Sequence, residues 1–265
     1  MIERMVARAE RARRREPVYV GAIVVGRILF SGLLRLKPVV SGIDAIPASG
    51  AAVLAATHFG YLDFALLEWV TWLRTRRRIR YLVTKGAYDR PVVGRLLRAM
   101  GHIRVDKSAG ADAYARAVEA LQAGELVGIF PEAGVSASFT VRELKTGAAR
   151  MAAAAGAPLI PVVIWGGQLL KTKNHRTSIR EAFRAPIRVV VGSASTLGPM
   201  DDPIEATLRL RSQLQALLDE AQASYPRSGM GEWWQPVHLG GTAPTPEEAA
   251  VWEAERQARK EAEHG

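Results

Sequence analysis

Residues 51–64 have the sequence AAVLAATHFGYLDF, in which polar residues separate two apolar runs. Six apolar residues come first, then Thr57 and His58, and Asp63 follows His58 five positions later inside a second apolar run. On one straight helix, five residues turn through about 500°, which would leave these two side chains roughly 140° apart. They would meet if the chain turned from a strand into a helix between them. The spacing alone does not decide between these arrangements.

The rest of the chain favours the strand-to-helix turn, because short β-rich runs alternate with helical stretches. This alternation is typical of an α/β fold. We therefore expect one α/β domain over residues 38–225, with a mixed, largely parallel sheet flanked by helices. The expected strands lie within residues 37–43, 51–57, 79–84, 101–105, 125–130, 158–165 and 186–192, and the expected helices cover 61–73, 91–100, 110–123, 143–155 and 203–224.

The composition of the chain limits which binding partners and which kinds of functional site are expected. The chain has 265 residues, a formal net charge of +10 and no cysteine. The positive charge predicts an anionic partner: a membrane surface, a nucleic acid or a phosphorylated substrate. The absence of cysteine excludes disulfides, thiolate metal sites and a cysteine nucleophile. The histidines outside 51–64 are scattered, so we expect no metal site.

The N-terminal part, residues 1–37, combines a basic segment with an apolar helix. Residues 1–16 are rich in arginine, and PVYVGAIVVGRILFSGLLRLK follows at 17–37. Its apolar part of about 19 residues approaches the length of a membrane-crossing helix. Arg27 lies in its middle, where a charge is costly in hydrocarbon. The pattern favours a helix that lies in or on the membrane interface, and a helix buried in the core remains the alternative.

The C-terminal part, residues 226–265, is rich in glycine and proline before it ends in a predicted helix. Thr245 is placed to cap that helix, Pro246 to occupy its first position and Glu248 to complete a capping box. Such an arm either wraps the domain or contacts a partner.

Four short blocks stand at the edges of predicted strands. They read THFGYLDF (57–64), GHIRVDK (101–107), FPEAGVS (130–136) and LIPVVIWG (159–166). In order and spacing they resemble the signature blocks of glycerolipid acyltransferases, especially the lysophosphatidic acid acyltransferases. The resemblance covers roughly residues 38–195 and implies an acyltransferase domain over 38–225.

For the first block, the resemblance implies that His58 is the general base and that Asp63 orients it. A hydroxyl must lose its proton to attack a thioester, and imidazole suits that task near neutral pH. A carboxylate on the other ring nitrogen fixes the tautomer. The implied co-substrate is acyl-CoA or an acylated carrier protein. No cofactor or metal is required.

For the other blocks, the resemblance implies an acceptor site. Lys85 and Arg104 would hold the acceptor's phosphate, and Glu132 would orient the acceptor or hold the site together. The family usually has an arginine where this chain has Val135. That departure shifts phosphate binding to Arg142 or Lys145, or puts the head group in doubt.

The implied acceptor is 1-acylglycerol 3-phosphate, and the product is phosphatidic acid. Trp69, Trp72 and the basic run at 74–80 suit a membrane interface. We therefore expect the protein at an anionic membrane surface, on the cytoplasmic face of the cell membrane as a peripheral or monotopic protein. Nucleic acid is not an expected partner, since no nucleic-acid motif accompanies the arginines. The alternatives are a glycerol 3-phosphate or glycolipid acceptor, or a catalytically inactive membrane-binding module.

Overall fold

A single sheet organises the chain, whose computed structural model describes residues 17–106 and 110–262. The basic segment expected at residues 1–16 lies outside the described residues. Within the described part, strand order is β1-β7-β6-β2-β5-β3-β4, and all neighbours pair in parallel except β6 and β7. The predicted mixed, largely parallel sheet is therefore confirmed. The strands are β1 (Val39–Ser41), β2 (Ala52–Ala56), β3 (Ile79–Thr84), β4 (Ile103–Val105), β5 (Leu126–Ile129), β6 (Leu159–Trp165) and β7 (Arg188–Val191).

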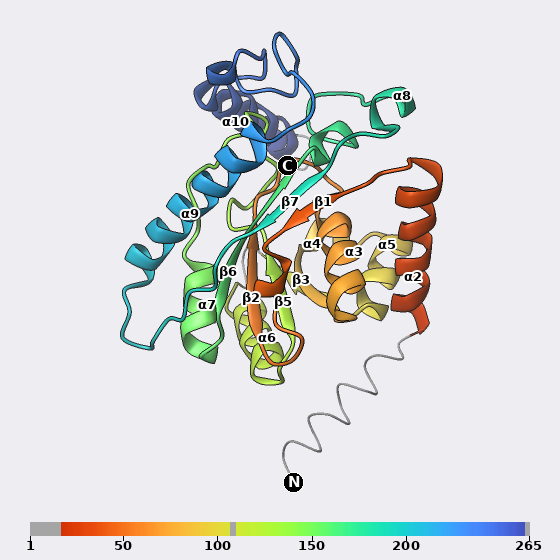
Figure 1. The fold of residues 1–265 in the computed structure, drawn as a ribbon. Coiled ribbons are helices and arrows are strands. Elements are labelled where there is room, and N and C mark those ends of the chain that lie inside the picture. Colours follow the sequence, from red (N-terminus) through yellow and green to blue (C-terminus); the bar gives the residue numbers. More distant parts are fainter. Residues whose placement is uncertain (1–16, 107–109, 263–265) are drawn as a thin grey trace.

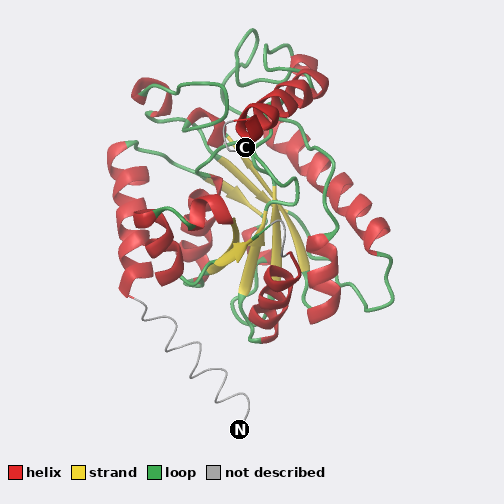
Figure 2. Cartoon of the chain, turned by 180° about the vertical axis from the view of Figure 1, so that it is seen from behind, coloured by secondary structure: helices red, strands yellow, loops and turns green. Residues whose placement is uncertain are grey.

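Helices cover both faces of the sheet, as Figures 1 and 2 show. Right-handed crossovers put α3 to α5 on one face, where the chain moves from β2 towards β4, and α6 and α7 on the other, where it returns. The helices are α2 (Pro17–Arg27), α3 (Asp63–Thr75), α4 (Lys85–Tyr88), α5 (Pro91–Ala99), α6 (Gly110–Gln122), α7 (Gly147–Ala155), α8 (Ile179–Ala182), α9 (Pro203–Ala223) and α10 (Pro246–Ala262), with a π-helix at Ile28–Leu33 and short 3₁₀ turns at Ile43–Ala45, Gly167–Leu169 and Val237–Leu239.

The central strands β2 and β6 are buried along their whole length. Because helices cover both faces of a parallel sheet, its central strands read as continuous apolar runs. That explains why residues 51–56 carry no alternating polar positions. The carboxyl ends of the parallel strands β2, β5, β3 and β4 lie along one edge, and the first and third blocks begin there.

The N-terminal helix is attached to the domain by one face only. Tyr19, Phe30 and Leu34 are buried, whereas Val25 and Leu33 each keep 66% of their surface exposed. Figure 1 shows α2 beside α3 and α5. Across the described residues, no helix combines the length and the apolar character that crossing a bilayer requires. The segment is thus neither a fully buried core helix nor an isolated one.

The predicted helix at 143–155 begins later than expected, at Gly147. The backbone N–H of Lys145 donates to the Pro131 carbonyl (2.9 Å), and the Arg211 side chain donates to the Arg142 carbonyl (3.1 Å). These long-range bonds hold residues 141–146 in a non-helical path, which places Arg142 beside the third block.

The C-terminal arm lies against the domain. Its predicted capping box is present: the Thr245 N–H donates to the Glu248 carboxylate (2.8 Å), and the Glu248 N–H donates to Thr245 Oγ1 (3.2 Å). Trp234, Ala243 and Ala249 of this arm are buried. Of the two roles left open by the sequence, the structure shows the arm packed on its own domain.

A buried acid joins the N-terminal helix to the sheet. Glu68 on α3 accepts a hydrogen bond from the Ile79 N–H (3.1 Å), and the Tyr19 hydroxyl of α2 also bonds it. Burial raises the pKa of Glu68 from 4.5 to about 8, although the bonds from Tyr19 and Ile79 oppose the shift.

Glu68→Gln should flatten part of the pH dependence of stability. Because the folded-state pKa of Glu68 is raised, the folded protein binds the extra proton, and this contribution is lost as pH rises through about 8. Between about pH 5 and pH 8, the free energy of unfolding of the wild type should therefore fall relative to that of the variant. Urea denaturation across this range measures the difference. The exposed Glu205→Gln is the control, and parallel pH profiles for Glu68→Gln and wild type would contradict the assignment.

Candidate active site

The turn after β2 changes the chain from strand to helix, as residues 51–64 suggested. Thr57 is buried, and its Oγ1 accepts a hydrogen bond from the Ile164 N–H of β6 (3.2 Å). This bond fixes the end of β2 against its neighbour. The chain then leaves the sheet, and α3 begins at Asp63.

Asp63 gathers three donors onto one carboxylate oxygen. Its Oδ2 accepts from the backbone N–H groups of Phe59 (2.8 Å) and Gly60 (2.7 Å), and His58 Nδ1 lies 3.3 Å away. The Asp63 side chain is fully buried. Burial raises its pKa, and the bonds from His58, Gly60 and Phe59 act against that rise. The predicted contact between His58 and Asp63 is present.

Two glycines allow this carboxylate to be enclosed. The 3₁₀ turn after β6 passes directly over the Asp63 side chain, and a Cβ atom on Gly167 would overlap Asp63 Oδ1. A Cβ atom on Gly60 would overlap the Gly167 carbonyl. The turn that follows the fourth block therefore contributes backbone, rather than a reactive side chain, to the surroundings of Asp63.

The His58 ring is held flat against an aromatic side chain. It stacks on Phe130 of the third block, with ring centroids 4.0 Å apart and planes 18° apart, and Phe130 in turn stacks on Tyr81. The His58 side chain is 16% exposed. Since Nδ1 faces the Asp63 carboxylate, Nδ1 carries the proton in the neutral ring and Nε2 carries the basic lone pair.

The third block encloses a second buried acid. Glu132 has its carboxylate 3.3 Å from Arg142 Nε. Burial raises the pKa of Glu132 to about 7, although the charge of Arg142 opposes the rise. The Ser136 N–H donates to the His58 carbonyl (2.8 Å), so the loop that carries Glu132 is bonded to the catalytic candidate.

The Arg142 side chain bonds the loop of the third block, whereas the Val135 side chain of that block is buried. Val135 is 2% exposed and packs inside. The Arg142 Nη2 group donates to the carbonyls of Glu132 (3.2 Å) and Gly134 (2.7 Å). A guanidinium is thus present at this loop, although it comes from further along the chain.

Lys85 and Arg104 form a separate group. Lys85 follows β3, Arg104 lies on the neighbouring β4, and β5 separates β3 from the strand that leads to His58. Both are exposed, and each pairs with an aspartate at 3.3 Å: Lys85 with Asp106, and Arg104 with Asp89. Lys145, the remaining predicted cation, has an exposed side chain.

Sequence reasoning missed a segment that touches the first block, residues 171–173. Thr172 Oγ1 donates to the Phe59 carbonyl (2.6 Å), and the Tyr61 N–H donates to the Lys171 carbonyl (2.8 Å). Lys173 lies next to these anchors, with its Nζ 2.8 Å from Glu253 of α10. No motif marks these residues; their only signal is their position after the fourth block.

The chemistry available here is proton transfer at His58 Nε2. A buried carboxylate orients the ring, and a second acid and a guanidinium lie on the adjoining loop. In the part of the chain that the structure describes, no cluster of three or more His, Asp or Glu side chains could hold a metal ion.

Ala133→Gly should stabilise the protein. Ala133 has φ of 57°, in the left-handed region that favours glycine. Relief of about 1–2 kcal/mol of steric strain should exceed the extra chain entropy of glycine, about 0.5–1 kcal/mol. The free energy of unfolding should rise by up to about 1 kcal/mol, measured by urea denaturation. The matched control, Ala137→Gly, should destabilise, and a loss of stability in Ala133→Gly would contradict the strain.

Comparisons with known proteins identify relatives of this chain. A family model described as Acyltransferase matches residues 37–165. The 1-acyl-sn-glycerol-3-phosphate acyltransferase of Bacillus subtilis is 33% identical over 182 residues, which cover 67% of this chain and 87% of that protein. The chloroplastic 1-acyl-sn-glycerol-3-phosphate acyltransferase LPAT1 of Arabidopsis thaliana is 27% identical over 56% of this chain.

The fold itself has a solved counterpart. The crystal structure of the 1-acyl-sn-glycerophosphate acyltransferase PlsC from Thermotoga maritima superposes with a TM-score of 0.66 at 20% identity, over 83% of this chain and 85% of that one. The chain spans less than half the length of the first curated relatives it matches, between 28% and 43%. The Bacillus subtilis relative, by contrast, is covered almost end to end, and on that match the chain belongs to the 1-acyl-sn-glycerol-3-phosphate acyltransferase family.

Proposed function

We propose that this protein transfers a fatty acyl group from an acyl-CoA or acyl carrier protein thioester to the free hydroxyl of 1-acylglycerol 3-phosphate, which yields phosphatidic acid. The observation that carries the proposal is the His58–Asp63 contact, on a fold and in a family whose named members acylate this acceptor.

In the proposed reaction, His58 Nε2 accepts the proton of the acceptor hydroxyl as its oxygen attacks the thioester carbonyl. The Asp63 carboxylate keeps Nδ1 protonated and stabilises the imidazolium that forms. The tetrahedral intermediate then expels the thiolate, which takes the proton from His58. An ester bond forms, a thioester bond breaks, and no covalent acyl-enzyme or cofactor takes part.

Cations near the carboxyl ends of the strands suit a phosphorylated acceptor. Arg142 bonds the Gly134 carbonyl of the third block, Lys85 follows β3, and Arg104 lies on the neighbouring β4. Guanidinium groups match the geometry of phosphate oxygens. Glu132, bonded to Arg142, would hold that loop in place.

An apolar and basic surface suits the membrane location. Val25, Ile28 and Leu33 of the N-terminal helical segment are exposed, and so are Val92 and Leu96 of the adjacent α5. Arginines flank both helices. Exposed apolar side chains beside basic ones are typical of interfacial helices on anionic membranes, and we propose the cytoplasmic face of the cell membrane as the site of action.

His58→Ala should abolish acyl transfer and leave the fold intact. Loss of a general base typically costs a factor of about 10² to 10⁴ in kcat. The measurement is release of CoA thiol with 1-acylglycerol 3-phosphate as acceptor. Thermal unfolding checks the fold, and the exposed His238→Ala is the matched control. Full activity in His58→Ala would disprove the mechanism.

The acceptor is tested by a panel, because Val135 in place of arginine leaves the head group open. Purified protein is offered palmitoyl and oleoyl thioesters with 1-acylglycerol 3-phosphate, glycerol 3-phosphate or a glycolipid. We expect 1-acylglycerol 3-phosphate to give the highest kcat/KM, since its phosphate can pair with the cations and its acyl chain can stay in the membrane. A higher value for glycerol 3-phosphate or the glycolipid would reassign the acceptor. Vesicle binding without turnover on any acceptor would indicate an inactive membrane-binding module.

A further inference from the structure

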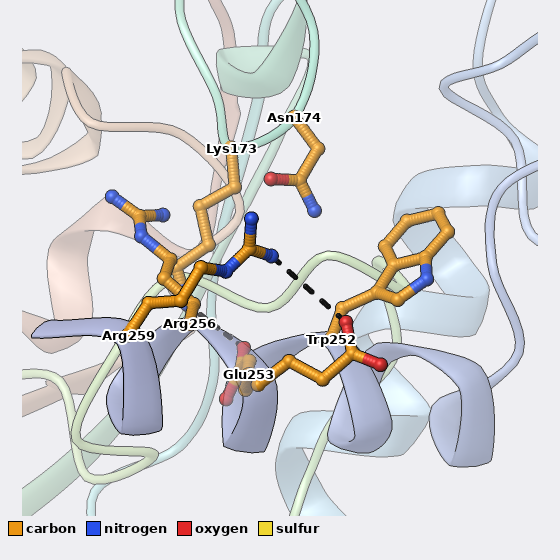
Figure 3. A pocket seen from close by; sticks show the side chains of 7 residues that line it. Lys173, Asn174, Trp252, Glu253, Arg256 and Arg259 are labelled. Atoms are coloured by element: carbon orange, nitrogen blue, oxygen red, sulfur yellow. Dashed lines mark hydrogen bonds and ion pairs between the residues drawn. The ribbon is translucent and has the colours of Figure 1, made fainter. Parts of the chain in front are cut away.

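A carboxylate from the C-terminal helix lies between two cations at the third block. Glu253 Oε2 is 2.7 Å from Arg142 Nη1, and Glu253 Oε1 is 2.8 Å from Lys173 Nζ. Each oxygen therefore serves one cation. Figure 3 shows the Lys173 side chain reaching down to Glu253 on α10. The Arg142 and Lys173 side chains are 23% and 15% exposed, so water screens this arrangement only in part.

Hydrogen bonds link the segments around both cations to the turn that carries His58. Arg142 bonds Glu132 and the Gly134 carbonyl, on the loop that donates to the His58 carbonyl. Lys173 follows Thr172, whose hydroxyl donates to the Phe59 carbonyl. The pair consequently has a fixed position relative to the base.

Glu253 is bound there as an anion. Burial by itself would raise its pKa, but the hydrogen bond from Lys173 and the charge of Arg142 lower it below the ordinary value. Two anionic oxygens held by a guanidinium and an ammonium reproduce two oxygens of a phosphate monoester.

The space beside Glu253 is open and lined mainly by charged side chains. A groove of about 640 Å³ lies beside α10, lined by Lys173, Asn174, Trp252, Glu255, Arg256 and Arg259 besides Glu253 itself. Figure 3 shows these side chains around the groove. A phosphate can therefore approach Lys173 through this groove.

We propose that Arg142 and Lys173 bind the phosphate of the acceptor, and that Glu253 occupies their site until that phosphate displaces it. This inference rests on the proposed function. It assigns to Lys173 and Arg142 the phosphate binding that the resemblance gives to an arginine at the position of Val135. It also means that Glu253 of α10 competes with the acceptor's phosphate for these two cations.

Glu253→Gln should strengthen acceptor binding. The amide keeps the shape of the side chain but loses the charge that competes with phosphate, so a larger fraction of the protein is ready to bind. We expect the KM for 1-acylglycerol 3-phosphate to fall roughly tenfold, the size of effect that loss of a charge-assisted bond produces, with kcat and the KM for acyl-CoA unchanged. Glu247→Gln, an exposed position on the same helix, removes the same charge and should change nothing. Equal KM values for both variants would overturn the proposal.

Lys173→Met in the Glu253→Gln background tests the cation directly. With the competitor already neutral, loss of the ammonium should raise the KM for 1-acylglycerol 3-phosphate again by roughly tenfold. The exposed Lys171→Met in the same background is the control. A changed KM for acyl-CoA instead, with that for the acceptor unaltered, would overturn the assignment to the acceptor and place the donor's phosphates here.

A binding measurement separates this proposal from the proposed function. Isothermal titration with inorganic phosphate and with glycerol 3-phosphate needs no turnover. Tighter binding by Glu253→Gln than by wild type and Glu247→Gln supports the site even if no acyl transfer is detected. Equal phosphate affinity in all three proteins rejects the site even if acyl transfer is fast.

Discussion

The buried carboxylate of Asp63 is the constraint on which the site depends. A charged group without water is costly unless donors surround it. Here the donors are the backbone N–H groups of Phe59 and Gly60 and the ring of His58, all from the turn that the carboxylate itself closes. The start of α3 adds the positive end of a helix dipole. The strand end, the helix start and the imidazole are therefore fixed together, because moving one would leave the carboxylate without a partner.

That constraint also explains the backbone around the site. The turn after β6 approaches so closely that Gly167 has no room for a side chain against Asp63. The same segment continues to Thr172, which bonds back to Phe59. The other neighbour of β2 is β5, and Phe130, the residue that follows β5, stacks on the His58 ring. The two strands beside β2 thus support the imidazole and its carboxylate from either side, so the protein itself holds the ring in one orientation.

The sequence was sufficient for the fold and for the contact between His58 and Asp63, because both rest on local patterns. Continuous apolar runs identify buried strands such as β2 and β6, and the capping box of α10 is readable at Thr245. The side chains that surround the third block could not be predicted from the sequence. Arg142 and Lys173 meet Glu253 across 111 and 80 residues of sequence. The helix expected at 143–155 starts late for the same reason. A hydrogen bond to the Pro131 carbonyl and another from the Arg211 side chain decide the path of residues that have ordinary helical propensity.

The sheet has two groups of cations near this edge, Lys85 with Arg104 and Arg142 with Lys173. An incoming anion must displace a different kind of partner at each. Lys85 and Arg104 pair with aspartates at exposed positions, where an ion pair contributes about 0–1 kcal/mol and exchanges readily with water. Arg142 and Lys173 are mostly enclosed, and their partner Glu253 belongs to a helix packed on the domain. An anion therefore gains little selectivity at the first group. At the second group, the proposed exchange requires the acceptor's phosphate to replace a carboxylate that already pairs with a guanidinium and an ammonium. A phosphate with two negative charges attracts these two cations more strongly than a singly charged carboxylate does at the same distances.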